Sequence, residues 1–461
     1  MSLSVKADLG EKSMQVNTTV SEPPGGTGLA DKGFSSFVAI WVSQFTTALA
    51  TALSGFGLNV WVFQKTNSVT AVSLLATCLM LPRLFTIVFA GAVVDRYGPR
   101  LAIIAGNVGT LFSLLPSLVL FWGGQPKLWH IFLSLTLVSI WQSLIGPAVL
   151  ASVPLVLGKK DFVRANGMLQ AGSAASAIIA PLVGGLMVVH FELATVLAIS
   201  LATYAVSIPI LALTRIPRAD GSNASQGTRS YLKEVSDAWG FLRYDPVLLR
   251  LTLVFGASSF VVAIATVLMK PLVLSFASPS ALGTVMSLSG VGLLLGGLVV
   301  TALGKGATSF KQVMSLMGIA GFCMALAGSR PMVFLIALAT LAYFFTMAIV
   351  SSGVQTIIQS SVPVALQGRV HATLAATSLA TMPLAFPIAG PLADYVFEPL
   401  LADGGMLAGN VGRVIGVGAG RGIGLLFVIL GSFIIGLSLI GRSEPRKEFG
   451  RANALAVNEQ E

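Results

Sequence analysis

The sequence predicts an all-α membrane protein with twelve transmembrane helices, and three observations lead to that fold class. Of the 461 residues, 55% are hydrophobic and 10% are charged, whereas soluble domains carry about 25% charged residues. The mean hydropathy is +0.86. Twelve apolar runs each have the length that a helix needs to cross a bilayer, which is about 20 residues. A polar, basic segment separates them into two groups of six, which predicts two helical halves.

Each apolar run is assigned to one membrane crossing. The spans of the first half are 34–63, 69–94, 101–122, 128–157, 167–190 and 193–213. Those of the second half are 249–276, 281–303, 310–328, 332–358, 371–398 and 421–440. The predicted organisation is a disordered tail at 1–32, a bundle at 33–213, a linker at 214–248, a bundle at 249–440 and a tail at 441–461. The linker places Leu232, Val235, Trp239 and Leu242 on one helical face, which predicts an amphipathic helix at the membrane surface.

Positive charge is distributed unevenly between the two alternating sets of loops. The richer set holds Arg96, Arg100, Lys159, Lys160, Arg164, Lys305, Lys311 and Arg369, and the poorer set holds Lys65, Lys127, Arg330 and Arg413. Cytoplasmic loops carry the excess of Lys and Arg, so we expect a cell-membrane protein with both termini in the cytoplasm. The cations behind the net charge of +10 are spread through loops and polar tails. This distribution fits orientation in a membrane, so no basic patch for nucleic acid is expected.

The connection between the second and third spans carries a recognisable motif. Residues 91–100 read Gly-Ala-Val-Val-Asp-Arg-Tyr-Gly-Pro-Arg. The major facilitator superfamily has the signature Gly-x-x-x-Asp-Arg-x-Gly-Arg-(Lys/Arg) at this place, and the sequence resembles it at Gly91, Asp95, Arg96, Gly98 and Arg100. Pro99 replaces the first residue of the closing basic pair. The resemblance implies two pseudo-symmetric six-helix bundles around a central cavity, and secondary transport by alternating access.

The resemblance also implies a role for this turn. Asp95 would face the positive N-terminal end of the eleventh helix, near residues 369–372. Arg96 or Arg100 would pair with Asp161, the acid near the end of the fourth helix. We expect these contacts to hold the two bundles together on the cytoplasmic side when the cavity opens outward.

The fifth span carries a stripe of small residues with a proline. Its members are Gly167, Ser176, Ala180, Pro181, Gly184 and Gly185. The stripe is similar to the pattern Gly-x8-Gly-x3-Gly-Pro-x2-Gly-Gly of antiporters in the superfamily. Small residues let two helix backbones approach closely, so we expect a seam that closes the inner half of the pathway. Ordinary helix packing is the alternative, and the antiporter likeness favours export.

Further segments resemble the macrolide-efflux and siderophore-exporter branch, the type 3 drug/proton antiporters. They are residues 60–66, 81–83, 146–148, 368–370 and 420–424. This likeness implies export of a hydrophobic or amphiphilic small molecule, such as a macrolide-like drug, a siderophore or a secondary metabolite. An uptake carrier and a non-transporting lipid-handling or sensor protein remain alternatives. An enzyme is disfavoured because no acid/base cluster lies at mid-membrane.

Polar and aromatic side chains within the spans are candidates for substrate binding. Arg83 lies near the middle of the second span, where a cation is costly and usually faces a cavity. Its guanidinium could instead bind a carbonyl freed by Pro82. Gln44, Trp141, Gln142 and Phe386 are the other candidates. Lys270 lies close enough to the outer end of the seventh span to reach the membrane surface, which favours a structural role.

Carboxylates that could carry a proton are scarce. None falls near the centre of a span, and Asp394, at the outer end of the eleventh span, is the candidate for proton coupling. Coupling to protons is therefore mainly an expectation from the family. Three scattered histidines and two separate cysteines lead us to expect no metal, cofactor or disulfide. The expected partners are the lipid bilayer and a small-molecule substrate, and the expected assembly is a monomer.

Overall fold

The computed structural model describes residues 27–124, 126–214, 216, 246–303, 310–361 and 364–442, and every regular element in these ranges is a helix. The first half contains α1 (Thr27–Thr66), α2 (Val69–Tyr97), α3 (Pro99–Trp122), α4 (Leu128–Gln142), α5 (Ile145–Val156), the short η1 (Lys159–Asp161), α6 (Phe162–His190) and α7 (Leu193–Leu213). The second half contains α9 (Pro246–Leu274), α10 (Pro279–Leu303), α11 (Phe310–Ser329), α12 (Val333–Ser361), α13 (Val364–Pro391), the π-helical η2 (Leu392–Phe397), α14 (Glu398–Leu401), α15 (Gly412–Ile415) and α16 (Arg421–Arg442). The predicted amphipathic helix of the linker and the predicted tails lie outside the described residues.

These helices confirm the predicted all-α membrane fold. Within the described ranges, eleven helical segments are long and apolar enough to cross a membrane, with α4 and α5 counting as one segment. The remaining long helix, α13, has 28 residues and is therefore about 42 Å long. It packs against α2 and α9, and it is the twelfth long segment among the described residues.

Two of the predicted spans are not single regular helices, and proline accounts for both. Pro147 has no N–H to donate to the carbonyl of Ser143, and the span at 128–157 is divided there into α4 and α5. Pro383, Pro387 and Pro391 lie in α13, and the helix continues as the π-helix η2. π-Helical turns are rare and often mark functional sites.

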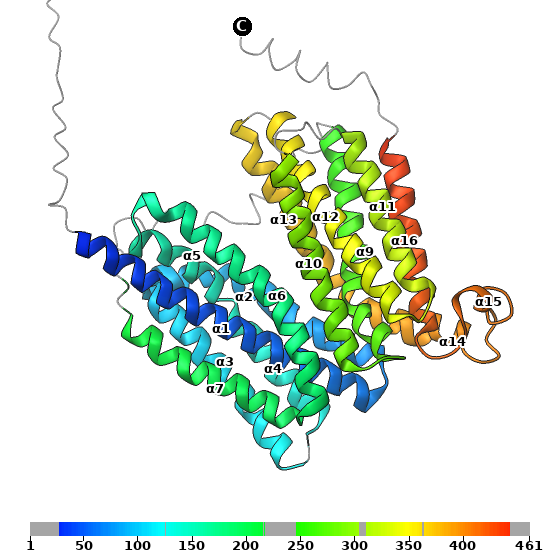
Figure 1. The fold of residues 1–461 in the computed structure, drawn as a ribbon, viewed down its shortest axis with the longest axis horizontal. Helices are drawn as coiled ribbons and strands as arrows, with labels where there is room; N and C mark the ends of the chain where they lie inside the picture. Colours follow the sequence, from blue (N-terminus) through cyan, green and yellow to red (C-terminus); the bar gives the residue numbers. More distant parts are fainter. Residues whose placement is uncertain are drawn as a thin grey trace, which may run out of the picture.

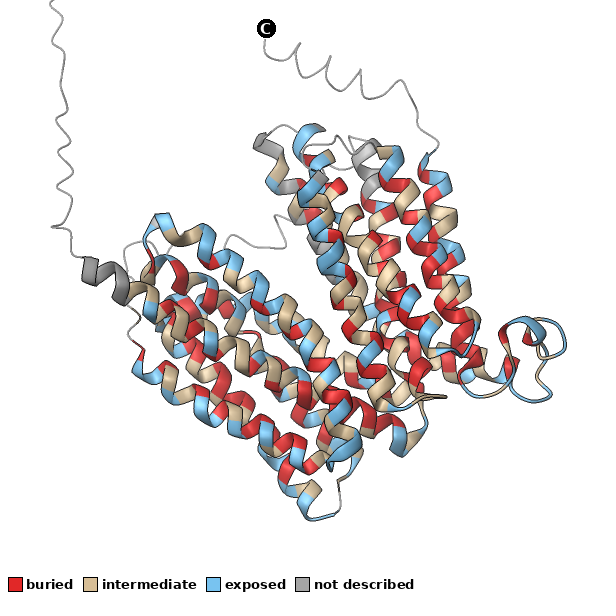
Figure 2. Ribbon diagram, in the orientation of Figure 1, coloured by how far each residue is buried: buried red, intermediate tan, exposed pale blue. Residues whose placement is uncertain are grey.

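The helices form two bundles, an N bundle of α1–α7 and a C bundle of α9–α16 (Figure 1). Buried residues lie inside each bundle and exposed ones lie on its outside (Figure 2). The outer surface includes large apolar side chains such as Phe85, Phe89 and Phe334. Such a surface suits a hydrocarbon solvent, because lipid tails are as apolar as these side chains.

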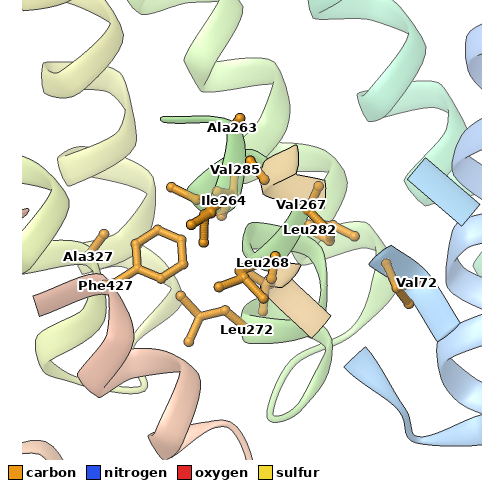
Figure 3. Close-up of a cluster of buried hydrophobic side chains, with 14 of the residues drawn as sticks. Val72, Ala263, Ile264, Val267, Leu268, Leu272, Leu282, Val285, Ala327 and Phe427 are labelled. Carbon is orange, nitrogen blue, oxygen red and sulfur yellow. The ribbon is translucent and has the colours of Figure 1, made fainter. Parts of the chain in front are cut away.

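The two bundles meet at one end and diverge toward the other (Figure 1). We call the end with the α1–α2 turn and η2 the closed rim, and the end with the α2–α3 turn and η1 the open rim. The first described residue of α1 and the last of α16 lie at the open rim (Figure 1). Near the closed rim, Val72 of α2 belongs to the same apolar cluster as the C-bundle residues Val267 and Leu282 (Figure 3). Any pathway between the bundles is therefore accessible from the open rim.

Candidate functional site

The first contact between the bundles is a seam between α6 and α10. The backbones approach so closely that a Cβ on Gly185 would lie 2.8 Å from the carbonyl oxygen of Pro279. The hydroxyl of Ser287 donates a hydrogen bond of 2.6 Å to the carbonyl of Ile178. Gly283 of α10 lies against the carbonyl of Pro181. Small residues on both helices therefore make this seam, as the sequence predicted for α6.

The seam occupies only part of α6. The contacting residues lie in the second half of α6, toward the closed rim. Ala180 and Ser176 are buried, and Gly184 packs against Phe56 of α1 within the N bundle. Gly167, near the start of α6, is exposed, and a Cβ there would meet nothing within 4 Å. The start of α6 therefore takes no part in this seam, and closure of the inner half of the pathway by the stripe stays a prediction.

The second contact is a seam between α13 and α2, and it carries a charge. A Cβ on Gly390 would lie 2.9 Å from the backbone nitrogen of Thr70, so the two helices touch there. Asp394 follows in η2 and accepts three hydrogen bonds from the start of α2. The Ser68 hydroxyl donates at 2.8 Å, the Val69 N–H at 3.0 Å and the Thr70 N–H at 2.8 Å. A carboxylate at a helix N-terminus is favourable because the first N–H groups have no partner within the helix.

Ser68 connects this contact to the helix itself. It is the N-cap of α2, and its hydroxyl oxygen accepts the N–H of Ala71 at 3.2 Å. The same hydroxyl donates its proton to Asp394. Asp394 thus links the bundles through the N-terminus of α2, a role that sequence reasoning did not assign to it.

A second carboxylate lies four residues farther along and serves a different helix. Glu398 accepts the N–H of Gly420 at 3.1 Å and the N–H of Ile423 at 3.0 Å, which caps α16 within the C bundle. Burial raises the pKa of the Glu398 carboxyl above its ordinary value, although these two N–H groups and Arg421 oppose that change. Arg421 is buried, and its guanidinium lies 5.5 Å from the ring centroid of Phe276. Sequence reasoning did not identify this cluster, because the loop at 402–420 separates its members.

At the open rim, the predicted turn between α2 and α3 forms as expected. Gly98 has a φ of +85°, which glycine adopts readily, and Pro99 is the first residue of α3. Asp95 is exposed, and Arg96 lies 5.5 Å from the ring centroid of Tyr97. A Cβ on Gly91 would meet nothing within 4 Å, so no neighbour requires a glycine at that position here.

The pairing of Arg96 or Arg100 with Asp161, expected when the cavity opens outward, stays a prediction. The guanidinium of Arg100 donates to the carbonyl of Ala212 in the last turn of α7, where a cation is favourable. Asp161 is the N-cap residue of α6, and its side chain makes no capping hydrogen bond. The side chain of Arg369 lies outside the described residues. In this conformation Arg100 therefore stabilises the N bundle and does not hold the bundles together.

Two predicted substrate residues are engaged inside the N bundle. The amide of Gln142 donates to the hydroxyls of Tyr204 at 3.1 Å and Thr110 at 3.3 Å, and Tyr204 is fully buried. The indole of Trp141 covers Gly109 of α3 so closely that a Cβ at Gly109 would collide with the ring. Both side chains therefore have packing roles in the structure.

The other predicted substrate residues have different surroundings. Gln44 is half-buried, and its Nε2 has no hydrogen-bond partner. Phe386 is partly buried against the main apolar cluster. Arg83 is exposed at mid-helix, as expected for a side chain that faces a cavity.

Next to Pro82, the backbone of α2 is hydrogen-bonded by the hydroxyl of Ser139. Ser139 of α4 donates to the carbonyl of Leu79 at 2.6 Å and accepts the N–H of Arg83 at 3.1 Å. The Ser139 hydroxyl thus takes the place of the missing backbone partner between Leu79 and Arg83. Both roles expected for the Arg83 guanidinium stay predictions.

A pocket of about 170 Å³ lies within the C bundle, beside the interface. Its walls are Val262, Ala265, Thr266, Met269, Lys270, Val285, Met286, Ser289, Cys323, Met324, Ala327, Ala339, Thr340, Tyr343, Phe344 and Phe427. We call it the C-bundle pocket. Lys270 lines it, in contrast to the expectation of a lysine that reaches the membrane surface. The sequence could not reveal this pocket because its walls come from five helices.

Comparisons with known proteins agree with the fold. The family model for the Major Facilitator Superfamily matches residues 40–387. The multidrug efflux pump Tap of Mycolicibacterium fortuitum is 24% identical over 364 residues, which are 75% of this chain and 88% of Tap. The enterobactin exporter EntS of Citrobacter koseri is 24% identical over 380 residues, which are 78% of this chain and 86% of EntS.

Solved structures share the architecture at lower sequence identity. The nucleoside transporter NupG has a TM-score of 0.63 and 14% identity, and the match covers 88% of this chain and 98% of NupG. A bacterial homologue of the human lysosomal transporter Spinster, described as inward-facing and unoccupied, has a TM-score of 0.63 and 15% identity. That match covers 91% of this chain and all of the homologue. The chain is thus a multi-pass membrane transporter rather than an enzyme, and it belongs to the Major Facilitator Superfamily.

Proposed function

We propose that this transporter exports a hydrophobic or amphiphilic small molecule from the cytoplasm by alternating access, and that the structure is its inward-facing state. The observation that carries the proposal is the asymmetry of the interface. Both seams, including the three hydrogen bonds to Asp394, lie at the closed rim. Asp95, which the family resemblance assigns to the opposite closure, is exposed at the open rim.

The orientation rests on charge. The short loops at the open rim include Arg96, Arg100 and Arg164, and an excess of Lys and Arg is typical of cytoplasmic loops. The open rim would then face the cytoplasm, together with both termini. A similar solved structure is described as inward-facing, and the names of Tap and EntS, an efflux pump and an exporter, support outward transport.

For Asp394 we propose the role of an outer gate. The sequence suggested a proton carrier, but a carrier must be accessible from both faces in turn. At the closed rim, Asp394 would meet only the external medium when the gate opens.

Flux in everted membrane vesicles tests the proposal. With an imposed proton gradient, vesicles containing the transporter should accumulate a labelled macrolide or siderophore, and vesicles with Asp95→Asn should accumulate about fivefold less. Accumulation in right-side-out vesicles alone would instead identify an uptake carrier. Saturable binding to the purified protein without flux in either orientation would identify a non-transporting sensor or lipid-handling protein.

A further inference from the structure

We infer that the C-bundle pocket binds the anionic group of an amphiphilic substrate, with Lys270 as the residue that pairs with that group. The inference rests on the proposed function and assigns a substrate class to it. It starts from a contrast within the pocket. Most of the wall is apolar, whereas Lys270, Thr340 and Tyr343 bring a cation and two hydroxyls into the same space.

The two hydroxyl groups lack partners. Thr340 is 4% exposed and Tyr343 is 7% exposed, and neither hydroxyl oxygen has a hydrogen-bond partner in the described structure. Buried polar groups in folded proteins nearly always have such partners. Both lie in α12, about one turn apart, and line the same pocket as Lys270. A polar ligand group in the pocket would satisfy them.

The hydrogen-bond donors of Lys270, Thr340 and Tyr343 favour an anionic ligand group. An ammonium group only donates hydrogen bonds, and threonine and tyrosine hydroxyls can also donate. A carboxylate only accepts and has about four lone-pair sites, which suits three convergent donors. No carboxylate belongs to the wall of this pocket, so the charge of Lys270 is not neutralised there. A cationic ligand would meet a like charge.

The remaining wall suits a flexible or aromatic apolar body. It includes Met269, Met286 and Met324 together with Phe344 and Phe427. Methionine side chains adapt to different shapes and make favourable contacts with aromatic rings. The volume of about 170 Å³ exceeds that of an apolar cavity known to bind benzene, which is about 150 Å³.

One wall of the pocket belongs to a helix of the interface between the bundles. Thr266 is the exposed member of its wall, and it lies on α9, the helix that contacts α1 and α2 of the N bundle. A substrate between the bundles could therefore place its anionic end in the pocket while its apolar part remains in the central space.

A matched pair of ligands tests the inference on the purified full-length transporter in lipid nanodiscs. 2-Naphthoate and 2-naphthamide have the same ring and nearly the same size, and only the acid is charged. Fluorescence titration, corrected with empty nanodiscs, should give a Kd for the acid at least about tenfold lower than for the amide, since a charge-assisted hydrogen bond contributes that much. Equal dissociation constants in the wild type would overturn the inference.

Variants identify the residue responsible. Lys270→Met keeps the apolar stem and should bring the acid-to-amide ratio to about one, whereas Lys270→Arg should retain the preference. Tyr343→Phe should weaken acid binding by about threefold, because one donor is lost. Lys127→Met removes an exposed charge from the other bundle and should leave the ratio unchanged. Unchanged amide binding in Lys270→Met would show that the pocket remains folded, and a preserved acid preference in that variant would contradict the assignment.

The binding experiment can fail independently of the proposed function. Export in everted vesicles without an acid preference would disprove the anion site and leave the exporter intact. An acid preference that depends on Lys270, in a protein without flux, would establish the site and refute export.

Discussion

The two ends of the α2–α13 pair differ in one respect that explains the conformation of the transporter. At the closed rim, the aspartate that follows α13 caps the start of α2 with three hydrogen bonds. At the open rim, the aspartate near the end of α2 is exposed, and the family resemblance directs it to the start of α13. Our proposal is that the two acids cap the two helices in opposite states, Asp394 in this one and Asp95 in the other. The rims therefore differ in their aspartates: Asp394 caps α2 at the closed rim, whereas Asp95 is exposed at the open rim.

Removing the cap that is formed should have the largest effect. Asp394→Asn leaves three donors with a neutral acceptor, and we expect the inward-facing state to lose about 2–3 kcal/mol relative to the outward-open state. This corresponds to a shift of about 30- to 150-fold in the equilibrium. A Ser73→Cys reporter in the α2–α13 seam, with the native cysteines replaced, should react correspondingly faster with an impermeant maleimide added outside. Unchanged reactivity would refute the gate.

The neutral seam between α6 and α10 should respond to volume rather than charge. Gly185→Ala places a methyl group against the carbonyl of Pro279, and we expect a cost of about 1–2 kcal/mol to the inward-facing state. Gly167→Ala, on the exposed part of the same helix, makes the same chemical change without a contact. Faster labelling of the Ser73→Cys reporter in the first variant alone is the expected result. Equal labelling of both variants would show that the seam tolerates the methyl group.

Neutralising Asp95, which is exposed in this structure, should shift the equilibrium between the two states in the opposite direction. We expect Asp95→Asn to destabilise only the outward-open state, by about 1 kcal/mol, because Asp95 is exposed in the inward-facing state. External labelling of the reporter should fall about fivefold, and export should fall with it. Normal insertion and thermal stability are expected. An increase in external labelling would contradict the reciprocal arrangement of the two caps.

Glu398 provides a nearby comparison for Asp394, because its carboxylate caps a helix of its own bundle. Glu398→Gln should therefore leave reporter labelling unchanged. Folding raises the pKa of Glu398, so its contribution to stability is present at low pH and is lost as pH rises through the raised pKa. The Tm of the wild type should fall slightly relative to that of the variant over this range, by about 2 °C or less. A parallel pH dependence of the two Tm values would refute this assignment.

The fold was predictable from the sequence, because apolar length and loop charge depend on local stretches of chain. The α2–α3 turn was equally predictable, since Asp95, Gly98 and Arg100 lie within six residues. The contacts between distant segments were not. Asp394 meets Ser68 across 326 positions, and nothing in the local pattern of either stretch identifies the other. Gln142 and Trp141 were assigned to a cavity because they lie at mid-span, but side-chain direction depends on how α4 packs.

The turn of α2 that contains Pro82 affects how the transporter changes state. Pro82 removes one hydrogen bond from the helix interior, and the hydroxyl of Ser139 lies across the same turn. Hydrogen bonds to another helix resist bending less than a continuous backbone ladder does, so the local bending stiffness of α2 is reduced at this turn. Because Asp394 holds the segment before Pro82 and Asp95 lies on the segment after it, the two segments can tilt independently. Closing the open rim therefore requires less than the rotation of a whole rigid bundle.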